Sequence, residues 1–92
     1  MIRSFRCTDT RRLFESGRSV RFGKVASIAA RKLTQLDAAT ELRDLASPPG
    51  NRLESLRGDR RGQVSIRINA QFRICFRWSE QGAENVEIVD YH

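Results

Sequence analysis

The hydrophobic positions change their period near the middle of the chain. Between residues 24 and 38, apolar residues recur at near-helical spacing and form one stripe. The run Pro48-Pro49-Gly50 then breaks the chain. After it, apolar and polar residues alternate over residues 64–68 and again over 72–78, as they do on strands with one buried face. The sequence therefore predicts an α+β fold, with helices first and an antiparallel sheet afterwards. The helical stripe consists of Val25, Ile28, Ala29, Leu33 and Leu36.

Shorter elements flank these segments. Residues 2–7 give a weak strand signal, and Thr8 is placed to cap a short helix that ends near Ser16. Gly17 can take the left-handed position after that helix. Thr40 can cap one more turn over residues 41–45, and a last strand is expected over 86–91.

The turn between the two alternating segments fixes their register. A three-residue loop, residues 69–71, pairs Ile66 with Ile74 and keeps the apolar residues on one face. A two-residue loop would mix the faces. The favoured register also places Arg67 directly opposite Arg73.

Like charges that face each other across two strands are destabilising. The polar sheet face carries Arg67, Arg73 and Arg77, so an anion bound there would relieve the repulsion. Alternatively, these arginines extend into water or pair with Glu87 and Asp90.

Length and composition set further limits. A chain of 92 residues has room for a single domain, residues 1–92. No apolar run approaches the roughly 20 residues of a membrane-spanning helix, and the first residues lack the apolar core of a signal peptide. We therefore expect a cytoplasmic protein without a membrane partner.

The charge balance suggests a polyanionic partner. Seventeen basic residues outnumber eleven acidic ones, and Lys24 and Lys32 are the only lysines. Arginine offers a planar fork that matches phosphate and stacks on bases, which favours nucleic acid. A merely soluble basic surface is the alternative.

A metal site is not expected. Cys7 and Cys75 lie far apart without a Cys-x-x-Cys motif, and His92 is the sole histidine. In the cytoplasm both thiols would be reduced, and the simplest interpretation is two small buried residues. No cofactor is expected either.

The second half of the chain contains side chains suited to cutting RNA. The RNA's 2′-hydroxyl can attack the adjacent phosphate, so an enzyme needs cations for the phosphate and an acid–base pair. Each candidate also has a simpler role, as a surface ion pair, a half-buried ring or a terminal residue. The candidates are Arg57 and Arg73 as phosphate clamps, Glu54 as base, Asp90 as a positioning group, Tyr91 as a stacking ring and His92 as a titrating group.

Together these segments resemble a known family. Residues 50–78, GNRLESLRGDRRGQVSIRINAQFRICFRW, resemble the core of the RelE-like superfamily, and in particular its HigB branch. The ending VEIVDYH, residues 86–92, resembles that branch's Asp-Tyr-His ending. Residues 1–5 and 37–45 are also similar, so the resemblance spans essentially the whole chain.

The resemblance implies a RelE-like, microbial-ribonuclease-like fold, with two N-terminal helices packed on a twisted antiparallel sheet of four to five strands. It implies a ribosome-dependent endoribonuclease that cuts mRNA in the A site and thereby inhibits translation and growth. Its partner would be a HigA-like helix-turn-helix antitoxin. The complex would bind operator DNA and repress its own operon.

Individual residues can be carried over from this branch. Arg73 matches its central-strand arginine, which implies phosphate binding in the transition state. Tyr91 would orient a base and His92 would be the acid–base group, with Asp90 beside them. Arg57 stands where many members have lysine, which implies that the positive charge is kept.

Glu54 departs from the family, because several members have histidine at this position. A glutamate can still act as a general base if its environment tunes it; otherwise the acid–base work falls to His92. Gly58 and Gly62 would shape the following loop, on which Arg60 and Arg61 are placed to contact ribosomal RNA.

Two other functions remain open on the sequence. The Glu54 departure allows a non-cleaving protein that binds RNA or the ribosome and blocks translation. A DNA-binding regulator would need a second helix at helix-turn-helix spacing from the helix over residues 24–38, and the sequence does not provide one.

Overall fold

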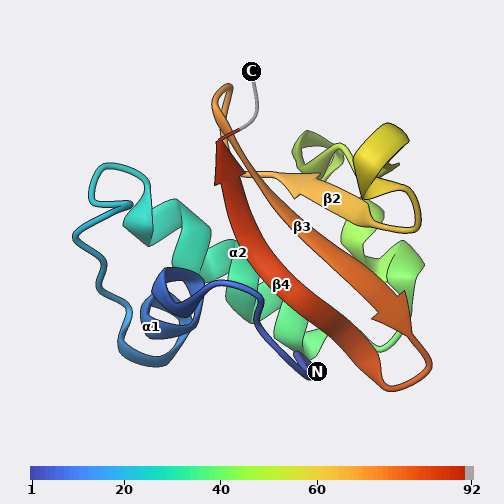
Figure 1. Cartoon of the computed structure of the whole chain (residues 1–92), viewed down its shortest axis with the longest axis horizontal. Helices are drawn as coiled ribbons and strands as arrows, with labels where there is room; N and C mark the ends of the chain where they lie inside the picture. The colour runs from blue at the N-terminus through green and yellow to red at the C-terminus, as the bar shows by residue number, and fades with distance from the viewer. Residues whose placement is uncertain (91–92) are drawn as a thin grey trace.

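The computed structural model describes residues 1–90 and confirms the α+β class. Two helices, α1 (Thr8–Ser16) and α2 (Ala26–Ala38), precede a four-stranded antiparallel sheet in the order β1-β2-β3-β4 (Figure 1). Three short 3-10 turns lie between the second helix and the second strand. The remaining elements are η1 (Leu42–Ala46), η2 (Pro49–Asn51), β1 (Glu54–Ser55), η3 (Gly58–Arg60), β2 (Val64–Arg67), β3 (Phe72–Ser79) and β4 (Gly82–Asp90).

One face of the sheet and the two helices enclose the core. Ile66 and Ile74 are fully buried on the sheet, and they pack in one cluster with Leu13 of α1 and with Leu33 and Leu36 of α2. The helical stripe predicted this arrangement, except that Ile28 is 36% exposed. Both helices therefore cover the same face, and the opposite face of the sheet is left for polar side chains.

The register of the β2–β3 hairpin is the one that the hydrophobic pattern predicted. Ile66 pairs with Ile74, and Arg67 pairs with Arg73. The turn is stabilised by Asn69, whose side-chain oxygen accepts hydrogen bonds from the backbone N–H of Gln71 and Phe72. This local bonding is typical of an Asx turn.

The N-terminal segment differs from the expectation. Residues 2–7 form no strand of their own; Ile2 and Phe5 make single parallel bridges to Ala83 and Val86 of β4. Between these bridges the register of β3 and β4 shifts, and Asn85 takes a left-handed conformation with φ 53°. The irregular edge leaves room for single contacts, not for a continuous ladder.

Element ends also differ in detail. Cys7, not Thr8, precedes α1, while Gly17 is left-handed as expected. Glu41 and Asp44 form a capping box at η1, and Thr40 does not cap it. β4 starts at Gly82, earlier than residue 86, because its first residues pair with the end of β3. Within residues 1–90, no helix has both the length and the apolar character needed to cross a bilayer.

Candidate active site

The sheet face opposite the helices, which we call the open face because neither α1 nor α2 covers it, carries two neighbouring rows of side chains. Its centre is still buried, since Ser65 and Cys75 are fully buried there. The first row crosses all four strands, through the pairs Glu54 with Ser65, Ser65 with Cys75, and Cys75 with Glu87. The next row contains Arg67 and Arg73. Side chains of one strand that are two residues apart point to the same face, so both rows lie opposite the helices.

Arg73 is a nearly buried cation on this face, and several hydrogen bonds fix its side chain. Its residue is only 8% exposed, and its Nε donates to Ser65 Oγ at 2.8 Å. One Nη donates to the backbone carbonyl of Arg52 at 2.7 Å and lies 3.6 Å from a carboxylate oxygen of Glu54. A buried guanidinium needs such partners, because burying an unpaired charge costs free energy. These contacts fix its direction before any substrate binds.

The carbonyl of Arg52 is itself held in place. Arg52 is left-handed, with φ 45°, at the end of η2. The preceding Asn51 is fully buried and donates to the carbonyls of Leu45 and Ser47. Lys32 of α2 donates to the Asn51 side-chain oxygen. The turn that supports Arg73 is therefore fastened to the second helix.

A second ion pair closes the other side of the face. Arg60 donates to Glu87 at 2.7 Å and to Gln63 at 3.1 Å, which fastens η3 to β4. Between the two arginines lies Cys75, and its burial raises the pKa of the thiol. The thiol therefore stays protonated at neutral pH and is not a nucleophile.

The edge of the sheet offers an open approach to Glu54. Its side chain is 50% exposed. A hollow of about 490 Å³ is lined by Glu54, Ser55, Leu56 and Arg57. The structure thus brings Glu54 and Arg73 together and places Arg57, which is exposed, on the same hollow as Glu54.

The other candidates are more dispersed. Arg61 and Arg77 are exposed and Arg67 is half-buried. Arg77 lies against Gly62, where an added Cβ would come within 2.7 Å of its Nη1. Asp90, at the end of β4, accepts a hydrogen bond from Gln71 at 3.0 Å.

The remaining two candidates, Tyr91 and His92, lie outside the described residues. Among residues 1–90, no three His, Cys, Asp or Glu side chains gather in an arrangement that could hold a metal ion.

Sequence reasoning missed three supports of Arg73: Ser65, the Arg52 carbonyl and Asn51. Ser65 was available from the pattern, as a small polar residue on the arginine face of β2. The other two were not, because a backbone carbonyl and a buried turn residue leave no periodic signal.

Known proteins resemble the chain over its whole length or a large part of it. Residues 3–92 match the family model described as RelE-like toxin of type II toxin–antitoxin system HigB. The chain is 36% identical over 95 residues to a Proteus vulgaris protein named Endoribonuclease HigB, covering all of both chains. It is 51% identical over 55 residues to Toxin HigB-1 of Vibrio cholerae, a match that covers 60% of this chain and 58% of the relative. The chain belongs to the HigB-like branch of the RelE-like toxins of type II toxin–antitoxin systems.

Proposed function

We propose that this protein is a ribosome-dependent endoribonuclease that cuts mRNA and thereby inhibits translation and growth. The observation that carries the proposal is Arg73, a nearly buried guanidinium fixed on the open sheet face beside a half-exposed carboxylate. A cation whose direction is set in advance stabilises charge that develops on a phosphate without having to reorganise. The name of the Proteus vulgaris relative, an endoribonuclease, supports the same activity.

In the proposed reaction the 2′-hydroxyl of the RNA attacks the adjacent phosphate, and no metal is required. Arg73 binds the phosphate, and Arg57 adds a second positive charge at the edge of the same face. A carboxylate oxygen of Glu54 lies 3.6 Å from an Nη of Arg73. When the phosphate is bound to the Arg73 guanidinium, Glu54 is therefore placed to accept the proton of the 2′-hydroxyl. Exposure of the carboxylate leaves it accessible to RNA.

The chain's last three residues complete this proposal. His92 would give a proton to the leaving 5′-oxygen, and Tyr91 would stack on or orient a base. Asp90 would position these neighbours. Arg60 and Arg61 would contact ribosomal RNA from the η3 loop, which the ion pair of Arg60 with Glu87 holds to β4. Arg67 and Arg77 would bind RNA around the reacting phosphate.

Membership of this family implies an antitoxin partner. We propose that the partner is a HigA-like helix-turn-helix protein, that the two proteins meet in the cytoplasm, and that operator DNA is bound only through their complex. A neighbouring gene that encodes a helix-turn-helix protein would support this assignment.

The proposal is tested by primer extension on a translated mRNA after brief expression of the chain. We expect cuts within translated frames for the wild type and none for Arg73→Ala. Arg43→Ala is the matched control, because Arg43 is 84% exposed and belongs to η1, which supplies none of the candidate residues. Cuts that persist in Arg73→Ala would contradict the assigned role of Arg73.

A non-cleaving translation inhibitor is distinguished in the same experiment. Growth arrest without cuts would support that alternative, and Glu54→His would then show whether the family residue restores cleavage. Cleavage by the purified protein on programmed ribosomes in the presence of a chelator tests the metal-free reaction.

A further inference from the structure

The net positive charge of this protein comes from the first third of the chain. Residues 1–32 contain nine of the seventeen basic residues and two of the eleven acidic ones, a net charge of +7. Residues 33–92, which supply the whole sheet, contain eight basic and nine acidic residues, a net charge of −1. Residues 33–92 taken together therefore lack the net excess of positive charge that draws a protein to a polyanion.

Part of this charge forms one surface around α1 and the loop that follows it. The helix-side patch, as we name it, consists of Arg12, Arg18, Arg21 and Lys24, all exposed. Arg12, Arg18 and Arg21 line one hollow of about 580 Å³ together with Asp9 and Glu15. Arg21 and Lys24 line an adjoining one of about 400 Å³, which reaches the β2–β3 turn at Asn69 and Gln71. α1 and α2 cover the sheet face opposite to Arg73, so the patch lies on the helix side of the molecule.

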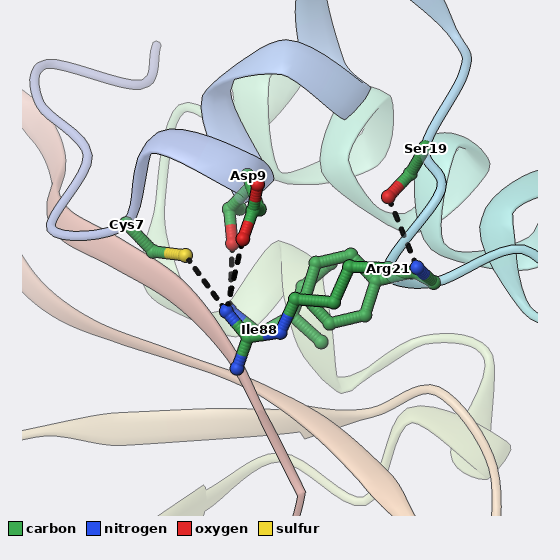
Figure 2. Close-up of polar contacts among 7 residues, drawn as sticks. Cys7, Asp9, Ser19, Arg21 and Ile88 are labelled. Carbon is green, nitrogen blue, oxygen red and sulfur yellow. Dashed lines mark hydrogen bonds and ion pairs between the residues drawn. The ribbon is translucent and has the colours of Figure 1, made fainter.

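Most cations of the patch form no direct ion pair with the residues that the structure describes. Arg21 pairs with Asp9 at 3.2 Å and donates to Cys7 Sγ, as Figure 2 shows. Within residues 1–90, no acidic side chain forms an ion pair with Arg12, Arg18 or Lys24. On the sheet side, by contrast, Arg60 and Arg73 have carboxylate partners.

The patch offers cations but few apolar anchors. Three large apolar side chains are exposed among the described residues, and of these only Val20, which is fully exposed, lies in the loop of the patch. Protein interfaces usually have a core depleted of charge and enriched in aromatic residues. Arginines around an open hollow instead match a phosphate backbone, whose closely spaced charges can engage several guanidinium groups at once.

We propose that the helix-side patch binds the phosphate backbone of folded RNA. This inference rests on the proposed function in one respect, that the RNA is ribosomal. The molecule would then be held to the ribosome from its helix side, while the open sheet face acts on the message. Binding and cleavage would be separable, because the patch contains none of the candidate active-site residues.

The experiment measures binding to vacant bacterial ribosomes, which contain no mRNA, so cleavage does not enter. The triple variant Arg12→Gln/Arg18→Gln/Lys24→Gln removes three exposed charges from the patch. Each lost phosphate contact lowers the slope of log affinity against log salt by about 0.7–0.9. We therefore expect a slope lower by about 2–3 and an affinity at least about tenfold weaker near 0.1 M salt.

The matched control is Arg12→Lys/Arg18→Lys, which keeps the charge and should keep most of the slope. Circular dichroism of each variant is used to check that it is folded. An unchanged affinity and slope in the triple variant would overturn the inference. If that variant instead lost binding to poly-glutamate while it still bound ribosomes, the patch would be a site for an acidic protein segment.

The two proposals can fail separately. Wild-type protein that binds ribosomes through the patch but cuts no message would leave this inference standing and refute the proposed activity. Cleavage on ribosomes by a triple variant of unchanged affinity would do the reverse.

Discussion

The support that Ser65 gives to Arg73 can be tested by a substitution that removes a single heavy atom. Ser65→Ala removes the Oγ that accepts the Arg73 Nε hydrogen bond at 2.8 Å, in a position that is fully buried. Water cannot readily replace the lost acceptor there. The remaining contacts to Glu54 and to the Arg52 carbonyl hold the other end of the guanidinium, so its direction should loosen without complete release.

The magnitude follows from the charge of the donor. A hydrogen bond to a charged group contributes about 1.5–3 kcal/mol, and leaving a buried donor unsatisfied costs a similar amount. We expect the free energy of unfolding to fall by about 2 kcal/mol. In a domain of this size that lowers Tm by about 8–16 °C. Because misplaced catalytic groups can cost up to about a hundredfold in rate, cleavage should fall roughly 10- to 100-fold at saturating ribosome.

Urea unfolding followed by circular dichroism measures the first effect, and single-turnover cleavage on programmed ribosomes measures the second. The control is Ser27→Ala, an exposed serine on α2, which should change neither quantity appreciably. If Ser65→Ala unfolded at the same urea concentration as the wild type, or cut at the same rate, Ser65 would not be what fixes Arg73.

Two further predictions concern loops. Hydrogen bonds from the backbone N–H groups of Glu41 and Thr40 lower the pKa of Asp44 from its ordinary value of 3.8. The charged carboxylate therefore stabilises the fold above that pH, and this contribution is lost as the pH falls through the lowered pKa. Asp44→Asn should therefore lower Tm at neutral pH, with the difference shrinking in acid; a pH-independent difference would contradict this cause. Gly62→Ala should cost about 1–2 kcal/mol, because φ is 90° there, whereas Gly50→Ala, with open space and no such φ, should be nearly neutral in urea unfolding.

The periodicity of the sequence was sufficient for the fold class and for the register of the central hairpin. A change of period from helical to alternating separates helices from strands, and a one-residue slip would have exposed Ile66 and Ile74. The sequence did not predict β1, which is too short to show a period, or the single bridges of residues 2–7 to β4.

The sequence also placed Arg67 and Arg73 on one face of the sheet, but it could not predict which of the two is more deeply buried. β1 covers β2 only at Val64 and Ser65, so Arg67 lies beyond the end of that pairing, while Arg73 lies on the strand between β2 and β4. Depth in the sheet depends on where neighbouring strands end, and alternation carries no such information. Counting charged residues likewise gave the sign of the protein's net charge, but not the side of the fold on which each charge lies.

What the sequence determined by itself was the α+β class, the hairpin register, the excess of arginine and the family motifs, because these depend on local pattern. Only the tertiary structure decided that Arg73 is the buried cation, that Glu54 and Ser65 contact it, and that the Arg52 carbonyl completes its support. The physical reason is that these partners come from separate strands and a turn up to 21 residues away, and a contact at that distance exists only once the sheet has formed.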